Sequence, residues 1–125
     1  MIVKLFGNLD FGGIKSVTEL PNNLTVNGDL DLRETEITEL PDNLTVKRNL
    51  YLFNTPITKL PNNLTKVNGN LDLSKTPLTE LPNNLTIDGD LDLSETDITS
   101  LPDNLTVKGS LDLEYTNITK LSDKG

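Results

Sequence analysis

The chain has 125 residues, and its 11 Lys and Arg stand against 19 Asp and Glu, which gives a net charge of −8 at pH 7. Neither His nor Cys occurs, and this excludes a His-based catalytic triad, a thiolate nucleophile, a disulfide framework and zinc bound by imidazole or thiolate. The negative charge disfavours direct contact with nucleic acid and with anionic membranes. We therefore expect a non-enzymatic protein that needs neither metal nor cofactor.

Residues 1–19 are expected to form an imperfect unit that caps the rest of the chain. The apolar stretch at the start is broken by Gly7 and Asn8, so it is too short for a secretory signal, and no apolar run of about 18 residues follows. The expected location is the cytosol. The side chains that would cover the first coil are those of Met1, Ile2, Val3, Leu5, Phe6, Leu9, Phe11 and Ile14.

Five near-copies of one unit fill residues 20–120, and each reads approximately LPxNLTVxGxLxLxxTxITx. The units, here called the first to fifth repeats, begin at Leu20, Leu40, Leu60, Leu81 and Leu101. The third repeat is one residue longer, and we interpret Lys66 as an insertion in the loop just before a strand. The whole chain, 1–125, is then a single repeat domain that ends in a tail at 121–125.

Within the first repeat, Val26, Gly28, Leu30 and Leu32 alternate with polar residues, which predicts one strand with one buried face. Pro41 follows the last apolar position, fixes its own backbone angle and turns the chain. One unit cannot bury its apolar side chains alone, whereas stacked units can. The sequence therefore predicts a mainly β solenoid about 25–30 Å long at a strand spacing of about 4.8 Å.

The segment from Leu30 to Pro41 has the pattern LxLxxTxIxxLP, which recurs with small changes, Leu78 for Ile in the third repeat and Ser122 for Pro after the fifth, and resembles the leucine-rich repeats. It is most similar to the short LP-containing repeats of bacterial and bacteriophage proteins. The resemblance implies a stack of five 20-residue coils plus an N-terminal partial unit, in the host cytoplasm if the chain comes from a phage. Two departures from the family, a polar residue at its first Leu and Thr in place of its Asn ladder, leave a straighter parallel β-helix as the alternative.

The ladder Thr hydroxyls are expected to bond the backbone of an adjacent turn. The Asn of each Asn-Leu-Thr corner is expected to satisfy turn groups locally. These two columns therefore have a sufficient structural explanation. They are Thr35, Thr55, Thr76, Thr96 and Thr116, and Asn23, Asn43, Asn63, Asn84 and Asn104.

Function on such a scaffold is expected on outward strand positions, because the inward ones form the core. The middle outward column consists of Asp31, Tyr51, Asp72, Asp92 and Asp112. The second repeat departs from the others, since Arg48 replaces Gly and Tyr51 and Phe53 replace Asp and a small or polar residue. Two aromatic residues beside Lys47 and Arg48 are typical anchors of a protein interface; neutral drift is the alternative interpretation.

The acidic column has three further interpretations. Asp72, Asp92 and Asp112 are compatible with a solvated face that keeps the protein soluble. Calcium would need six to eight oxygens in a pocket, which a flat row does not offer. A glycosidase-like carboxylate pair among Asp90, Asp92 and Asp112 lacks any sign of a cleft.

Two functions follow as expectations. The first is a non-catalytic protein-protein interaction module that uses the outward strand face around Tyr51 and Phe53. The second is an acidic, phage-encoded mimic of nucleic acid that inhibits a host nuclease or defence complex. We also expect two copies to associate through their C-terminal coils, where Leu111 and Leu113 have no further repeat to cover them.

Overall fold

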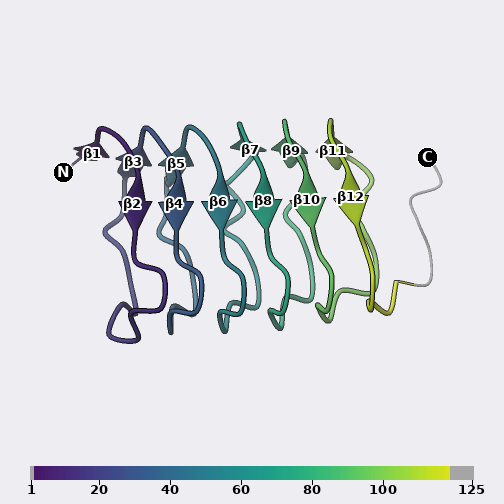
Figure 1. Cartoon of the computed structure of the whole chain (residues 1–125). Helices are drawn as coiled ribbons and strands as arrows, with labels where there is room; N and C mark the ends of the chain where they lie inside the picture. Colours follow the sequence, from purple (N-terminus) through teal and green to yellow (C-terminus); the bar gives the residue numbers. More distant parts are fainter. Residues whose placement is uncertain (1, 119–125) are drawn as a thin grey trace.

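The computed structural model describes residues 2–118, and this part of the chain is a parallel β-solenoid of about six turns that contains no helix (Figure 1). None of the described residues belongs to a helix that could span a membrane. The predicted tail at 121–125 lies outside the described residues. The strands are β1 (Val3–Leu5), β2 (Leu9–Asp10), β3 (Leu24–Val26), β4 (Leu30–Asp31), β5 (Thr45–Val46), β6 (Leu50–Tyr51), β7 (Lys66–Val67), β8 (Leu71–Asp72), β9 (Thr86–Ile87), β10 (Leu91–Asp92), β11 (Thr106–Val107) and β12 (Leu111–Asp112).

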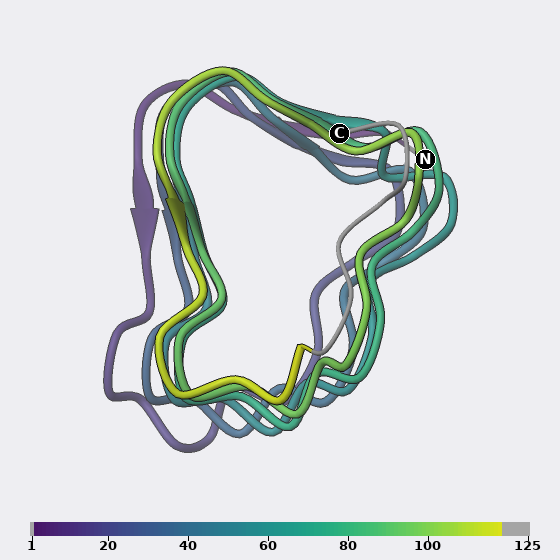
Figure 2. The same cartoon turned by 90° about the vertical axis from the view of Figure 1, so that its right-hand side faces the viewer.

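One parallel sheet runs the whole length of the stack in the order β2-β4-β6-β8-β10-β12, and we call it the long sheet. Its register places Leu beside Leu and Asp beside Asp, as in the pairs Leu91–Leu111 and Asp92–Asp112. The coils lie in a nearly straight row (Figure 1) and superimpose closely when viewed down the stack, except where the N-terminal coil, in purple, swings outward after β2 (Figure 2). The predicted β-solenoid is confirmed.

The predicted single strand from Val26 to Leu32 is wrong, because two short strands with a corner at Asn27 and Gly28 take its place. At this corner the Gly28 amide donates to the Gly7 carbonyl at 2.9 Å. A Cβ on Gly28 would collide with the Asn8 side chain and lie 2.7 Å from the Gly7 carbonyl carbon. Glycine is needed because two backbones approach closely here. The alternation survives because the corner keeps the same side chains inward.

The inward Leu, Ile and Val side chains form one continuous core along the stack. Residues such as Leu50, Leu71 and Leu91 have at most 1% of their surface exposed. The ladder Thr residues are buried as well, but their hydroxyls bond within their own coil: Thr35 Oγ1 donates to the Leu32 carbonyl at 2.8 Å. The expected bond to an adjacent turn is therefore wrong. A hydroxyl is too short to reach the next coil, and the carbonyl three residues back is nearer.

Residues 2–19 form a coil of the solenoid and do not lie across its end. β1 pairs with β3 and β2 pairs with β4 in the same register as the later repeats. The outer face of this coil is open, since Ile2 and Phe6 are 71% and 87% exposed. The predicted N-terminal partial unit is thus a sixth coil whose Val3, Leu5, Leu9 and Phe11 pack against the core.

The last described coil is also more open than its neighbour. Leu111 is 39% exposed, whereas Leu91, at the same position of the fourth repeat, is fully buried. Tyr115, in the turn after β12, is 81% exposed and does not shield this coil. Association of two copies through this coil stays a prediction.

Each repeat has a residue with a left-handed backbone immediately before the ladder Thr, in addition to the left-handed Asn23, Asn43 and Asn84. The residues before the ladder Thr are Glu34, Asn54, Lys75, Glu95 and Tyr115, with φ between 55° and 59°. A side chain other than Gly or Asn in this conformation costs about 1 kcal/mol. The repeat tolerates this strain because the neighbouring Thr and Leu are fixed in the core.

Replacing Glu95 with Gly is expected to raise the free energy of unfolding by about 0.5–1 kcal/mol, because Gly adopts φ near 57° without strain. Thermal or urea unfolding measures the change. Glu36→Gly is the control, since Glu36 is exposed and has no positive φ; it should lower stability by a similar amount. Destabilisation by both substitutions would show that the turn before Thr96 is not left-handed.

A second row of short strands accompanies the long sheet but is interrupted between β5 and β7. We call this interruption the seam. β1, β3 and β5 form one three-stranded sheet, and β7, β9 and β11 form another. Lys66 itself begins β7 and pairs with Thr86, so the loop before β7 is one residue longer than in the other repeats, as predicted. In the end view a teal segment lies outside the other coils at the corner before this strand (Figure 2). The extra residue displaces the third repeat, so β7 does not pair with β5.

Candidate functional site

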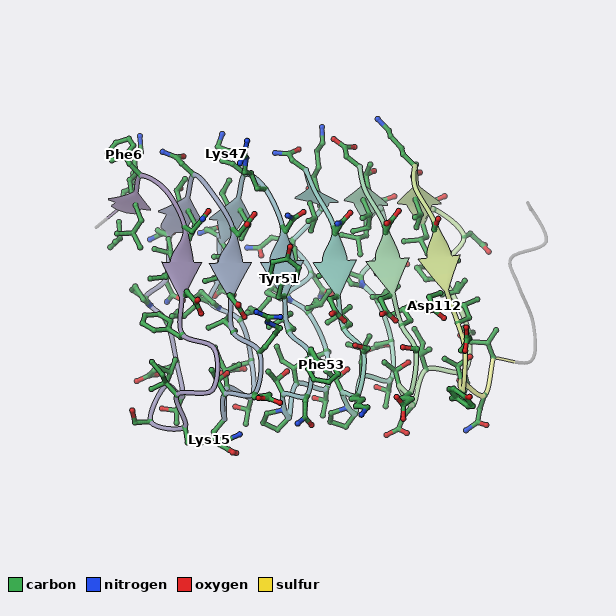
Figure 3. The ribbon with its side chains drawn as sticks, viewed as in Figure 1. Phe6, Lys15, Lys47, Tyr51, Phe53 and Asp112 are labelled. Atoms are coloured by element: carbon green, nitrogen blue, oxygen red, sulfur yellow. The ribbon has the colours of Figure 1, made fainter. Side chains whose placement is uncertain are left out.

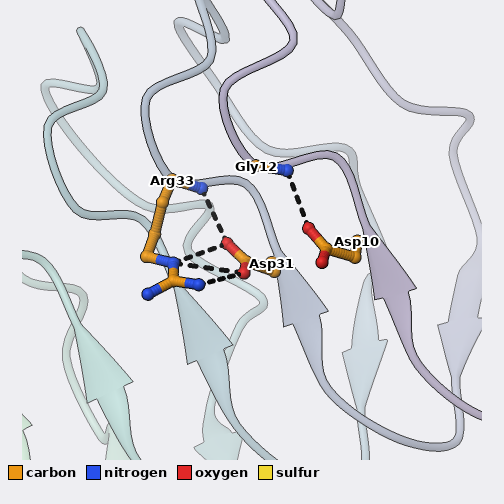
Figure 4. A network of polar contacts seen from close by, with 4 residues as sticks. All are labelled: Asp10, Gly12, Asp31 and Arg33. Carbon is orange, nitrogen blue, oxygen red and sulfur yellow. Dashed lines mark hydrogen bonds and ion pairs between the residues drawn. The ribbon is translucent and has the colours of Figure 1, made fainter.

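The carboxylates of the middle outward column each close a turn just after a strand of the long sheet. Asp31 Oδ1 accepts the Arg33 amide at 3.0 Å, and Asp92 Oδ1 accepts the Ser94 amide at 2.9 Å. The N-terminal coil repeats this bond between Asp10 and the Gly12 amide at 2.9 Å (Figure 4). Asp72 and Asp112 make the same bond, to Ser74 and Glu114. The acidic column is therefore first a structural feature that fixes the turn.

In two of these turns a Ser hydroxyl bonds the same carboxylate oxygen as the amide. Ser74 and Ser94 add hydroxyl bonds of 2.6 and 2.7 Å to Asp72 and Asp92. Within residues 2–118 no group of three or more acidic side chains is arranged to hold a metal ion. The calcium interpretation receives no support from this geometry, because calcium takes six to eight oxygens and the described residues form no such group.

The column that precedes the acidic one connects neighbouring coils. Asn8 Oδ1 accepts the Asp29 amide, Asp29 Oδ1 accepts the Asn49 amide, and the chain of bonds continues through Asn70 and Asp90 to the Ser110 amide. The distances lie between 2.7 and 3.0 Å. Asp90 is thus engaged with the next coil, and Asp92 with its own turn. The Oδ1 atoms of these carboxylates thus hold the backbone of the coils, which gives the glycosidase interpretation no support.

A second ladder joins the Asn residues of the Asn-Leu-Thr corners. Asn43 Nδ2 donates to Asn23 Oδ1 at 2.8 Å, Asn63 Nδ2 to Asn43 Oδ1 at 3.0 Å, and Asn104 Nδ2 to Asn84 Oδ1 at 3.1 Å. We had predicted local turn bonds for these residues, and that prediction is wrong. An amide that recurs every 20 residues faces its own copy, which both donates and accepts. The fixed period was the signal that could have revealed this ladder.

Tyr51 and Phe53 interrupt the acidic column, and the structure covers one side of each ring with a cation. The Arg33 guanidinium lies 5.4 Å from the centroid of the Tyr51 ring, and Lys75 Nζ lies 5.5 Å from that of Phe53. Both rings are half-buried. Figure 3 shows Tyr51 on the long sheet and Phe53 in the turn after it. The site is therefore a pair of aromatic rings held between cations from the repeats on either side.

Arg33 also holds Asp31. Its Nε lies 2.9 Å from Asp31 Oδ1, and its Nη2 lies 2.6 Å from Asp31 Oδ2 (Figure 4). Burial alone would raise the pKa of Asp31, but the side-chain and backbone hydrogen bonds from Arg33 and its positive charge together lower it. The ion pair raises the pKa of Arg33 in turn. Asp31 is thus a charged carboxylate with both oxygens bonded to Arg33. This ion pair holds the Arg33 guanidinium over the Tyr51 ring.

Replacing Arg33 with Gln is expected to lower stability by about 1 kcal/mol at neutral pH. The folded pKa of Asp31 lies below its ordinary value of 3.8, so the ion pair stabilises fully above that pH. Its contribution disappears as the pH falls through the lowered pKa. Urea midpoints of both proteins between pH 7 and pH 2 measure this difference. A gap that grows below pH 3.8 would contradict the assignment.

A hollow lies beside Phe53, between the N-terminal coil and the first two repeats. It is lined by Asp10, Gly12, Gly13, Asp31, Arg33, Glu34 and Phe53. Lys15 Nζ donates to the Glu34 carbonyl at 2.7 Å nearby. The aromatic pair therefore stands next to a depression on the N-terminal side, which gives a docking partner both a raised and a recessed part of one face.

Arg48 lies apart from the two rings. Arg48 and Lys47 follow β5 at the corner between the two sheets, and both are exposed. Figure 3 shows Lys47 at the edge of the molecule, away from Phe53. The predicted set thus divides into an aromatic site on the long sheet and a basic corner beside the seam.

No family model, curated protein or solved structure matches this chain. The functional argument therefore rests on this chain's own departures from its repeat. Three departures lie in two neighbouring coils: the aromatic pair, Arg48 and the inserted Lys66.

Proposed function

We propose that the chain is a non-catalytic protein-binding module, similar to the short LP-containing leucine-rich repeats, whose partner docks on the long sheet around Tyr51 and Phe53. The observation that supports this proposal is the exchange of a turn-closing Asp for Tyr51. Every other coil keeps that carboxylate and its bond to the amide two residues later. The second repeat gives up this bond and presents two half-buried rings.

The surroundings of the rings favour a protein partner. Arg33 and Lys75 hold the rings in place, so little side-chain entropy remains to be lost on docking. Aromatic residues in a fixed position, with Arg beside them and a polar rim of Asp72 and Glu34, have the composition of an interface centre. The partner then contacts the rings directly and meets the acidic column as a rim.

The double variant Tyr51→Asp, Phe53→Ser tests the proposal, because it restores the repeat. Asp at 51 and Ser at 53 reproduce the Asp92–Ser94 turn, so stability should stay within about 0.5 kcal/mol of the parent or rise. The partner is captured from the native host, identified and purified, and its affinity for both proteins is measured. We expect the double variant to bind at least about 30-fold more weakly.

Asp72→Asn, Asp92→Asn is the matched control. Asn keeps the Oδ1 acceptor of the turn and removes only the charge. Docking on the rings predicts nearly unchanged affinity for this control. An affinity that falls with these Asn substitutions, falls steeply with salt and is competed by DNA would instead establish the nucleic-acid mimic and reject the proposal.

A further inference from the structure

The seam leaves backbone groups unpaired at one place on the surface. At the other coil junctions the residue after the strand donates to the preceding coil: Asp88 N to the Val67 carbonyl and Lys108 N to the Ile87 carbonyl, both at 2.9 Å. The equivalent amide at the seam belongs to Asn68. Within the described part of the chain, neither Asn68 N nor Gly69 N makes a hydrogen bond. Two neighbouring donors therefore have no hydrogen-bond partner among residues 2–118.

Three cationic residues lie on the two repeats that meet at the seam. Lys47 and Arg48 follow β5, Lys66 begins β7, and all three side chains are exposed. The two repeats that carry them are direct neighbours, since β6 pairs with β8 in the long sheet. Neighbouring coils are about 4.8 Å apart, so these side chains share one small area. The chain has a net charge of −8, so this local excess of positive charge is unusual for its surface.

The acidic groups nearby leave most of that charge uncompensated. Lys66 Nζ lies 3.7 Å from Asp88 Oδ2, and Lys108 Nζ lies 3.4 Å from Asp88 Oδ1. The single negative charge of Asp88 is thus shared between two lysines. Within residues 2–118, Lys47 and Arg48 form no ion pair and no hydrogen bond through their side chains.

We propose that the seam is a binding site for a phosphate monoester dianion. Lys47, Arg48 and Lys66 supply charge, and Asn68 N and Gly69 N supply directed donors. A tetrahedral dianion has enough oxygens to accept from a guanidinium, two ammonium groups and two amides together, whereas a carboxylate does not. The inserted residue and the replacement of Gly by Arg48 thus act on one site. This proposal is independent of the aromatic docking site.

The test is a titration followed by the amide resonances of the full chain, at low ionic strength and pH 8. Inorganic phosphate is one probe and a short phosphoserine peptide is the other, with acetate as the monoanionic control. We expect saturable shifts largest at Asn68 and Gly69, and at least fivefold weaker binding of acetate. A response to the peptide alone would assign the site to a phosphorylated protein, and a response to both would assign it to phosphate in general.

Four variants decide the outcome. Lys47→Gln and Arg48→Gly should each weaken phosphate binding at least fivefold, while Lys108→Gln, on the same edge beside an intact junction, should weaken it less than twofold. Deletion of Lys66 should restore the 20-residue period, pair β5 with β7 and abolish the shifts at Asn68 and Gly69. Equal weakening by all three lysine and arginine substitutions, or shifts spread over every lysine, would overturn the proposal. A short DNA duplex that binds as tightly as phosphate would overturn it too.

Discussion

Replacing Leu91 with Ala is expected to lower the free energy of unfolding by about 2–5 kcal/mol, the largest effect of any single substitution considered for this chain. Leu91 is fully buried, and β10 pairs with both β8 and β12, so neighbours on two sides enclose the cavity. The fixed spacing of the coils prevents those neighbours from closing it. Urea denaturation at neutral pH measures the loss.

Asp92→Asn is the control for this substitution, because Asp92 is the next residue along the same strand and faces outward. Asn keeps the acceptor for the Ser94 amide and removes one charge from the acidic column, so stability should stay near that of the parent. Equal losses for the two variants would mean that the inward and outward faces of the long sheet have been exchanged.

Gly89→Ala is expected to cost about 1–3 kcal/mol. An added Cβ would collide with the Asn70 side chain and lie 2.9 Å from the backbone of Gly69. The Gly89 amide also donates to the Gly69 carbonyl at 3.0 Å, and Asn70 Oδ1 accepts the Asp90 amide at 2.8 Å. The new atom therefore strains two coil-to-coil bonds at once. Thermal unfolding measures the effect.

Arg48→Gly is the reciprocal change, since Arg48 occupies the equivalent position in the second repeat. Within residues 2–118 the Arg48 amide does not make the bond that Gly28, Gly89 and Gly109 make to the preceding coil. Gly at this position should therefore leave stability unchanged or raise it by up to about 1 kcal/mol. A neutral Gly89→Ala would show that the corner relaxes easily and that Gly is not required there.

The coil and its core could be predicted from the sequence because the period of the repeat determines which residues meet. Leu30, Leu50 and Leu71 recur at 20 or 21 residues, and burial of such side chains requires neighbouring coils in register. The corner at Gly28 escaped prediction because two strands that meet at a corner keep the same inward alternation as one longer strand. The alternation of apolar and polar residues does not indicate whether the backbone forms one strand or two.

The polar columns could be predicted as columns but not as hydrogen bonds. The same pattern places Asp31 and Asp29 on neighbouring rows, yet Asp31 bonds two residues ahead and Asp29 bonds to the next coil. A bond within the turn and a bond to the next coil both fit the repeat pattern, and only the geometry of the turn decides which one forms. For Tyr51, the sequence identified an unusual residue, but the cation of Arg33 over its ring depends on a rotamer and was not predictable.

The loop before β7 takes up the extra residue of the third repeat, as predicted, but the break between β5 and β7 was not predicted. Loops commonly absorb an extra residue, and we expected that outcome. In a solenoid the loop before β7 is itself packed against neighbouring coils, so the displacement reaches the strand and separates β5 from β7. An insertion in a stack of coils affects the junction with the preceding coil. A hairpin loop, by contrast, would have left the neighbouring strands paired.

Amide hydrogen exchange of the whole chain tests most directly the claim that the coils are in register on the long sheet and out of register at the seam. The amides of Leu50, Leu71 and Leu91 donate to the next coil at 2.9 Å and should exchange slowly, near the rate set by global unfolding. Asn68 and Gly69 should exchange at least about 100-fold faster than Asp88 and Gly89, their counterparts in the fourth repeat. Equal protection of the two pairs would contradict the seam and the site built on it, and fast exchange at Leu71 would contradict the solenoid register itself.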